Sequence, residues 1–244
     1  MMSRKTQMIL VTAAVASFAT VAVAWTVWEL SKSRSYQLFG ELVTRVETLD
    51  SAVALTFDDG PVPGYTDSVL ALLADSSVPA TFFVVGAELA EHADLARRIL
   101  RAGHELGNHS YSHQSLVFKT PTYVRQEIQK TDSLIRAAGQ HGVIHFRPPY
   151  GKRLVVLPWL LSRAGRPTVL WDLEPDSYSS FARDPGLIVD HVMRNVRPGS
   201  IILLHVETPG RVTGRAALPS LIGSLRAAGY ELVTVSELTR RASS

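Results

Sequence analysis

Residues 54–65 read ALTFDDGPVPGY and carry the first strong structural signal of the folded part of the chain. The apolar run up to Phe57 is typical of a buried β-strand, and the glycine and prolines that follow predict a sharp turn. Two adjacent acids, Asp58 and Asp59, stand where the strand ends. Neighbouring carboxylates repel each other and prefer water. Their place after an apolar strand therefore indicates either turn chemistry or a site that needs negative charge.

Further strands and helices alternate downstream of this stretch. Strands that alternate with helical patterns indicate parallel βαβ units and the α/β class. The expected fold is a (β/α) barrel of about seven parallel strands, short of the usual eight, and a doubly wound open sheet is the alternative. The expected strands are residues 52–57, 80–85, 104–109, 144–149, 168–173, 201–205 and 230–235.

The N-terminal segment differs from the rest of the chain. Residues 8–28 carry no charged side chain, and about 20 apolar residues suffice to cross a bilayer as one hydrophobic helix. Trp25 and Trp28 favour a retained anchor with an interfacial aromatic belt. A small-x-small pattern at residues 22–24 leaves a cleaved secretory signal as the rival interpretation.

The expected organisation follows from this contrast. Residues 1–30 form a membrane anchor or signal peptide, residues 31–49 a linker and residues 50–240 the folded domain. Basic residues flank the apolar run on both sides and give no clear orientation. Large domains translocate largely regardless of such charges, so we expect an external domain on a single-pass cell-membrane protein. Cleavage would instead give a secreted protein.

Composition narrows the functional classes. The chain has 244 residues, is 46% hydrophobic and carries a formal net charge of +3. Nucleic acid is not an expected partner, because neutralising a phosphate backbone needs clustered Lys and Arg. The chain has no cysteine, which excludes disulfides and thiolate metal sites. The sequence gives no indication of the oligomeric state.

Unusual polar residues gather after the expected strands. The carboxyl ends of parallel barrel strands share one face, where active sites of such barrels are built. These residues are therefore expected to meet in one place. They are Asp58 and Asp59 after the first strand, His109 and His113 after the third, Arg147 and Tyr150 at the end of the fourth, Asp172, Glu174 and Asp176 after the fifth, and His205 at the end of the sixth.

The acids and the histidines together suggest a metal site. In HSYSH, His109 and His113 stand four residues apart, so they would share one face of a helical turn and could bind one ion. A divalent cation on one of the two acids would relieve their repulsion and leave the other as a free base. Two imidazoles and one carboxylate leave positions open for water and substrate. Zinc suits these ligands best, and cobalt or another first-row ion also fits.

Four motifs in this order resemble the polysaccharide deacetylases, carbohydrate esterase family four. They are TFDDG, HSYSH, RPPYG and ILLH, each at an expected strand end, and the resemblance covers about residues 50–238. It implies a deformed (β/α) barrel that removes N-acetyl or O-acetyl groups from polysaccharides such as chitin, peptidoglycan or xylan. The domain over residues 50–240 would then be the catalytic domain, with a cell-wall or extracellular polysaccharide as its partner.

The resemblance also implies roles for residues of the first two motifs. Asp58 is similar to the general base of the family. Asp59, His109 and His113 are similar to its metal ligands.

Further roles come from the third and fourth motifs. Arg147 resembles the residue that orients the base, and Tyr150 the one whose backbone N–H stabilises the oxyanion. Pro149 and Tyr150 would contact the substrate, and His205 resembles the general acid.

One motif departs from the family pattern. The family often has Asp-x-x-Asp-Trp, in which the second Asp supports the acid and the Trp walls the pocket, but residues 171–180 read WDLEPDSYSS. Asp176 is the expected partner of His205, with Glu174 as the second candidate. Ser177 or Tyr178 stands where Trp is expected, so Tyr178 is a candidate substrate-binding residue.

Two other functional classes remain open from the sequence. A metal-dependent hydrolase of another C–N bond, such as that of a small amide or ureide, would use similar ligands. A non-catalytic carbohydrate-binding barrel would not need the base, the metal ligands and the acid together. Release of acetate from N-acetylglucosamine oligomers separates all three classes.

Overall fold

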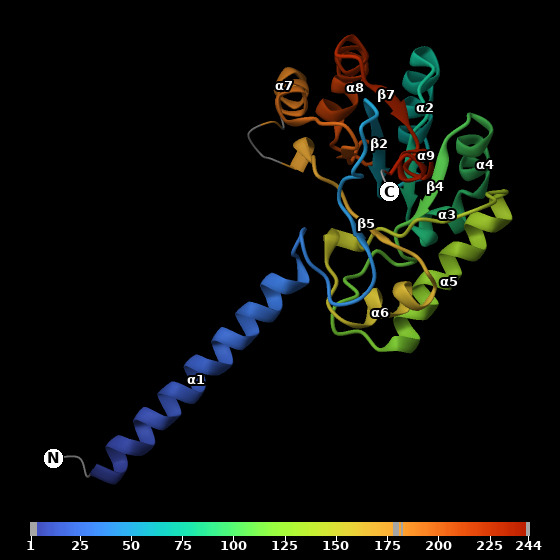
Figure 1. Cartoon of the computed structure of the whole chain (residues 1–244). Helices are drawn as coiled ribbons and strands as arrows, with labels where there is room; N and C mark the ends of the chain where they lie inside the picture. The colour runs from blue at the N-terminus through green and yellow to red at the C-terminus, as the bar shows by residue number, and fades with distance from the viewer. Residues whose placement is uncertain (1–3, 178–180, 182, 243–244) are drawn as a thin grey trace.

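A computed structural model describes residues 4–177, 181 and 183–242. Helix α1 (Arg4–Ser31) projects from an α/β domain that contains the other described elements (Figure 1). It is exposed almost throughout, and only Ser31 at its end is buried. By length and composition α1 is apolar enough to cross a membrane. The predicted N-terminal hydrophobic helix is therefore present.

Five parallel strands form the main sheet. The order is β4 (Glu105–Asn108), β3 (Thr81–Val84), β2 (Ala52–Asp58) and β6 (Ile201–Leu204), and β7 (Glu231–Val233) pairs with the first half of β2. Every residue of β2 is buried, as expected for the central strand of a parallel sheet covered on both faces. The α/β class with parallel strands is confirmed.

Shorter links continue from this sheet. β1 (Leu42–Val43) pairs in parallel with β5 (Thr168–Val169). Single parallel bridges join Phe146 to both Asn108 and Thr168, and Leu173 to Ile202. The links therefore run from β2 through β3 and β4 to the β5 region, and from there through β6 back to β2.

Two strand predictions need correction. Residues 144–149 do not form a full strand, because only Phe146 makes ladder-type bridges. The two prolines that follow Arg147 have no N–H to donate to a ladder. The expected strand over residues 168–173 shortens to β5. In contrast, β1 was not predicted, and buried Val43 and Val46 show that packed structure begins before residue 50.

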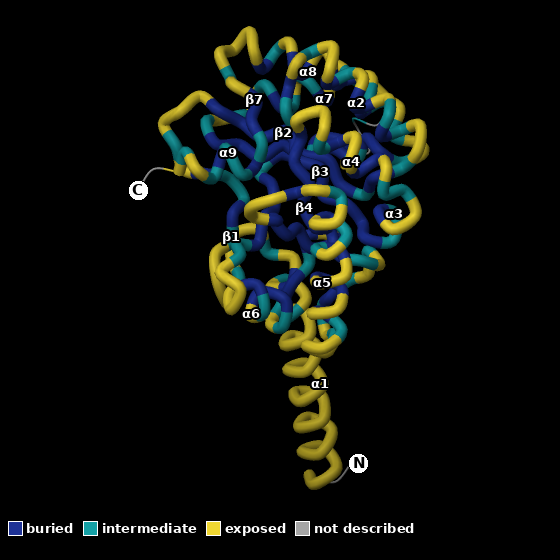
Figure 2. The backbone as a smooth tube through the Cα atoms, turned by 90° about the vertical axis from the view of Figure 1, so that its right-hand side faces the viewer, coloured by how far each residue is buried: buried dark blue, intermediate teal, exposed yellow. Residues whose placement is uncertain are grey.

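The helices cover the strands on the outside. Helical patterns in the sequence over residues 66–77, 92–103, 122–139, 155–165 and 185–196 predict α2, α4, α5, α6 and α7. The pattern over residues 216–229 predicts α8 but starts four residues after this helix does, and α3 and α9 are additional. Figure 2 shows the buried strands in dark blue, enclosed by helices of the domain that combine buried, intermediate and exposed residues. The bounds are α2 (Tyr65–Ser76), α3 (Gly86–Glu91), α4 (Ala93–Arg101), α5 (Pro121–Ala138), α6 (Val156–Arg163), α7 (Pro185–Asn195), α8 (Val212–Ala227) and α9 (Val235–Arg240), with short 3₁₀ turns η1 (Pro149–Gly151) and η2 (Pro175–Ser177).

The alternation of side chains along β2 determines where the site lies. Val53, Leu55 and Phe57 belong to the core cluster that also contains residues of α2 and α8. Ala52 and Ala54 instead pack in a cluster with residues of β5 and β6. Because side chains alternate with a period of two, Thr56 and Asp58 continue this second side. The carboxylate of Asp58 is thereby directed inward, away from α2 and α8.

Candidate active site

The two acids that end β2 reach one cavity by different routes. Asp58 is 1% exposed and continues the inward side of the strand. Asp59 has φ 76°, a left-handed conformation that Asp tolerates better than most residues. This turn brings the Asp59 side chain back toward the same space. Both acids line a cavity of about 290 Å³ together with His109, His113, Tyr150, Trp171, Glu174 and His205.

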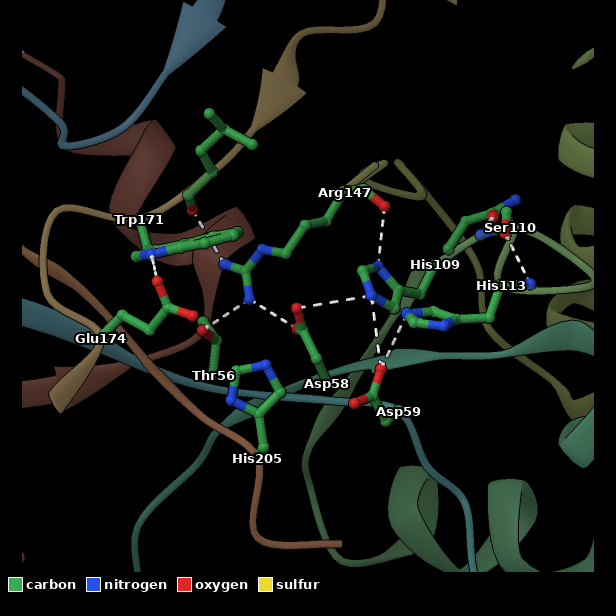
Figure 3. Close-up of polar contacts among 12 residues, drawn as sticks. Thr56, Asp58, Asp59, His109, Ser110, His113, Arg147, Trp171, Glu174 and His205 are labelled. Atoms are coloured by element: carbon green, nitrogen blue, oxygen red, sulfur yellow. Dashed lines mark hydrogen bonds and ion pairs between the residues drawn. The ribbon is translucent and has the colours of Figure 1, made fainter. Parts of the chain in front are cut away.

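Asp58 is held by a buried arginine. Arg147 Nη1 donates to Asp58 Oδ1 at 2.7 Å and to Thr56 Oγ1 at 2.9 Å, and Nη2 donates to the carbonyl of Leu170 at 2.9 Å (Figure 3). The guanidinium carbon lies 3.9 Å from the centre of the Phe83 ring. Burial lowers the pKa of Arg147, and the charge of Asp58 opposes this change. Asp58 Oδ1 is therefore engaged, while Oδ2 is directed toward His109.

Asp59 lies against the two histidines. His113 Nε2 is 3.1 Å and His109 Nε2 is 3.6 Å from Asp59 Oδ1. Figure 3 shows this pair on one side of the two acids and His205 on the other. Burial tends to raise the pKa of Asp59. The hydrogen bond from His113 and the charges of His109, His113 and His205 outweigh burial and hold this pKa well below its usual range.

His109 has the orientation of a metal ligand. Its Nδ1 lies 2.8 Å from the carbonyl of Arg147, a contact that places the ring proton on Nδ1 and leaves Nε2 facing the acids. Burial lowers the pKa of His109, although the charges of Asp58 and Asp59 oppose this. A neutral imidazole is the form that binds a metal.

Three ligand atoms converge in a way that suits a divalent cation. One atom each from Asp59, His109 and His113 lies within 4.8 Å of the other two. A carboxylate with two imidazoles is a donor set that zinc and similar first-row ions accept. These residues therefore fit the metal that the sequence suggests.

The loop that carries His113 is not the helical turn expected from the spacing of the histidines. Residues 109–113 are irregular, and Ser110 and His113 have φ values of 65° and 55°. The backbone N–H groups of Tyr111 and Ser112 both bond to Glu127 of α5, so they are not available for helical bonds. The carboxylate of Glu127 thus determines a loop shape that the spacing of the histidines alone does not reveal.

His205 follows β6 and pairs with Asp176 of η2. Asp176 Oδ2 accepts the backbone N–H of His205 at 2.6 Å, and Oδ1 lies 3.2 Å from its Nδ1. Burial tends to lower the pKa of His205. The hydrogen bond with Asp176 and its charge, with smaller contributions from Asp58 and Asp59, raise this pKa overall to about 9. Of the two candidate partners, the structure brings Asp176 to His205.

Glu174 and Asp172 bond elsewhere. Glu174 accepts from Trp171 Nε1 at 2.8 Å and from Ser177 Oγ at 2.7 Å. Asp172 accepts from Ser200 Oγ and from the backbone N–H of Ile201, which ties it to β6. Asp172 is not among the described residues that line the cavity.

The expected substrate-binding residues have different surroundings. Tyr150 lies in η1 with φ 60°, is 60% exposed and places its ring centre 4.9 Å from that of His113. Pro149 is buried and is not among the described residues that line the cavity. Tyr178 lies outside the described residues. Tyr150 is therefore the one of the three that the structure places at the cavity.

Two arginines line the cavity that the sequence interpretation did not place there. Arg211 precedes α8 and donates to the carbonyl of Asp176 at 3.0 Å. Arg34 follows α1, pairs with Glu174 at 2.5 Å and stacks 4.8 Å from the centre of the Trp171 ring. In the sequence, Arg34 is only one of the basic residues that flank the apolar run. Neither arginine belongs to a periodic pattern or motif, so the local sequence does not indicate that they lie at the cavity.

A buried base candidate, a metal-type ligand set and an acid candidate in one cavity define a site suited to hydrolysis. Comparison with known proteins agrees. A family model described as polysaccharide deacetylase matches residues 45–169. A chitooligosaccharide deacetylase from Sinorhizobium fredii is 41% identical over 170 residues, which cover 68% of this chain and 77% of that protein. The chain belongs to the polysaccharide deacetylase family.

Two further matches show the breadth of this family. A peptidoglycan-N-acetylglucosamine deacetylase from Bacillus cereus is 34% identical over 203 residues, which cover 82% of this chain and 94% of that protein. A crystal structure from Bacillus anthracis matches with a TM-score of 0.75 at 28% identity, covering 85% of this chain and 74% of that one. That protein is described as a pseudoenzyme of carbohydrate esterase family four. Membership of the family alone therefore does not establish catalysis, and the residues present in each member's own site must be considered.

Proposed function

We propose that this protein hydrolyses N-acetyl groups on N-acetylglucosamine units of a cell-wall or extracellular polysaccharide or oligosaccharide. The names of the relatives from Sinorhizobium fredii and Bacillus cereus support this substrate class. The proposal rests on one observation: a single cavity is lined by Asp58, Asp59, His109, His113 and His205. Each group has a contact that matches its proposed part in amide hydrolysis.

Asp59, His109 and His113 would hold a divalent metal, and zinc is the ion we propose, with cobalt or another first-row ion as alternatives. Such an ion would polarise the acetyl carbonyl and make a nearby water a better nucleophile. Asp59 is suited to this part because its Oδ1 lies 3.1 Å from His113 Nε2 and 3.6 Å from His109 Nε2. His109 contributes a ligand whose orientation is already set by the carbonyl of Arg147.

Asp58 acts as the general base in this proposal. Its Oδ1 is held by Arg147, which leaves Oδ2 free to accept the proton of the attacking water. The fixed ion pair limits motion of the base, so little reorganisation is needed during the reaction. The backbone N–H of Tyr150, on the left-handed turn at η1, would stabilise the oxyanion. One such donor contributes about 3–4 kcal/mol to transition-state stabilisation.

His205 acts as the general acid. Departure of the sugar amine requires a proton, and His205 with a pKa of about 9 holds one at neutral pH. Asp176 maintains this charged state through its contact with Nδ1, so Nε2 would be the donating atom. Acetate-ester cleavage requires the acid less, because an alkoxide leaves more readily than an amide anion.

For the cellular location, we propose a single-pass membrane protein whose catalytic domain, residues 50–240, lies outside the cell. Helix α1 supports this by its length and composition, as it would also support a signal peptide. A cleaved signal would give a secreted enzyme with the same catalytic site.

The test of the proposed function is acetate release by the zinc-loaded protein. N-acetylglucosamine oligomers, peptidoglycan and acetylxylan serve as substrates, and we expect release from those with N-acetylglucosamine. Turnover of a small amide or ureide without release from any saccharide would favour the other C–N hydrolase class. Stoichiometric zinc with no turnover of any substrate would favour a non-catalytic barrel.

A further inference from the structure

The segment that follows α1 is anchored to the catalytic domain by a buried arginine. Arg153 is 1% exposed, and its guanidinium donates to the carbonyls of Ser33 and Tyr36 at 2.6 and 3.1 Å and to Gln37 Oε1 at 3.2 Å. Its backbone N–H donates to the carbonyl of Ser31 at 2.8 Å. Burying a charge is costly unless it is well hydrogen-bonded, so these contacts favour one position for residues 31–37.

The same arginine connects this segment to the turn at the active site. Arg153 Nη1 donates to the carbonyl of Gly151 at 2.9 Å, and Gly151 ends the turn η1 that carries Tyr150. Lys152 lies between them and places its Nζ 4.3 Å from the ring centre of Trp28 at the end of α1. Figure 1 shows that α1 ends where the chain enters the domain. The end of the apolar helix is therefore close to the cavity.

This placement brings Arg34 to the cavity wall. One Nη of Arg34 pairs with Glu174, and the guanidinium stacks on Trp171, whose ring is also 5.4 Å from the guanidinium carbon of Arg147. Glu174 and Trp171 lie together beside Arg147 (Figure 3). The Arg34 side chain remains 48% exposed and lines the cavity. A guanidinium has five N–H donors, and the pair with Glu174 uses few of them.

We propose that Arg34 is a substrate-binding residue, which donates its remaining N–H groups to oxygen atoms of the sugar that carries the acetyl group or of its neighbour. Arg153 is the positioning residue that holds Arg34 in place. This inference rests on the proposed function, because it names a contact for the saccharide substrate. It also makes the segment after α1, upstream of the family match at residues 45–169, part of the active site.

The test compares a saccharide with a small ester in the zinc-loaded full-length protein. Arg34→Ala should raise KM for an N-acetylglucosamine oligomer about tenfold with little change in kcat, because hydrogen bonds from a charged donor to the sugar are lost. The rate of p-nitrophenyl acetate hydrolysis should not change, because this ester has no sugar. The rate of the Asp58→Asn variant is subtracted as the background. The KM of Arg34→Lys for the oligomer should lie between those of the wild type and Arg34→Ala, since lysine keeps the charge and loses the planar fork of N–H donors.

Lys32→Ala is the matched control. It removes the same charge from the same segment, but Lys32 pairs with Glu29 and is not among the described residues that line the cavity. Its KM for the oligomer should equal that of the wild type. An unchanged KM in Arg34→Ala, or an equal fall of activity on both substrates, would overturn the inference.

Arg153→Lys tests the positioning role. It should raise KM for the oligomer as Arg34→Ala does, and the double variant should show no further increase because both changes act through one contact. If Arg153→Lys does not fold, Gln37→Ala takes its place in the test, because it removes one of the hydrogen bonds made by Arg153. Additive effects of the two changes would refute this role. A wild type that releases no acetate from saccharides would refute the proposed function itself, and the Arg34 contact with it.

Discussion

The pairing of His205 with Asp176 makes a quantitative prediction about pH. The pKa of His205 is raised from 6.5 to about 9, and after the opposing effect of burial the hydrogen bond and charge of Asp176 are the largest contributions to this rise. Asp176→Asn removes the charge and keeps a side chain of nearly the same shape. The pKa of His205 should therefore fall toward its ordinary value.

The sign of the effect follows from the role of the acid. A proton donor works in its protonated form, which is present below its pKa and lost as the pH rises through it. Lowering the pKa moves the alkaline limb of the kcat/KM profile to lower pH. If the pKa returns to 6.5, only about 3% of the imidazole is protonated at pH 8, compared with about three quarters at pH 6. The activity of Asp176→Asn should then fall about 25-fold between these pH values, while the wild type loses little.

The assay is acetate release from an N-acetylglucosamine oligomer between pH 5 and 10, with both proteins loaded with zinc. Any effect of the metal on His205 is common to both and cancels in the comparison. Glu174→Gln is the matched control, because Glu174 bonds to Trp171, Ser177 and Arg34 instead of His205. If the alkaline limb of the kcat/KM profile stays in place in Asp176→Asn and shifts in Glu174→Gln, the partner of His205 is Glu174, and the assignment of Asp176 is refuted.

Three further predictions concern the metal, the acid and the N-terminus. His109→Ala or His113→Ala should abolish both activity and stoichiometric zinc, since two remaining ligands hold zinc poorly; full metal content by elemental analysis in either variant would remove that residue from the ligand set. His205→Ala should lower N-deacetylation about 100-fold or more and O-deacetylation less, while metal content stays unchanged; equal losses on amide and ester substrates would argue against an acid that serves the amine. The protein should remain with the membrane fraction as a full-length chain, and a mature N-terminus at Trp25 by sequencing would show a cleaved signal peptide instead.

Much of the fold and of the site could be predicted because the signals are local. The apolar run of residues predicts β2, and β-branched and aromatic residues predict β3. Asp58, Asp59 and His205 follow buried strands, and parallel strands bring their carboxyl ends to one side. These residues do line one cavity.

The parts that could not be predicted depend on contacts between distant residues. The loop with His113 takes its shape from Glu127 in α5, and no spacing within HSYSH reveals that partner. Arg34 reaches the cavity because Arg153 binds the backbone of residues 33 and 36. In residues 144–149 the apolar start suggested a strand, but the prolines leave Phe146 as the bridging residue. For the loop and for Arg34, contacts with distant residues decided what local propensity left open, whereas Pro148 and Pro149 are a local signal against a full strand.

The most direct test of the account compares Asp58→Asn with Asp59→Asn, with zinc content and acetate release measured on the same samples. Asp58 Oδ1 is held by Arg147, whereas Asp59 Oδ1 faces both His109 and His113. Asp58→Asn should therefore keep stoichiometric zinc and lose turnover, and Asp59→Asn should lose both. Equal loss of zinc in the two variants, or full turnover in Asp58→Asn, would contradict the division of the two acids into base and metal ligand.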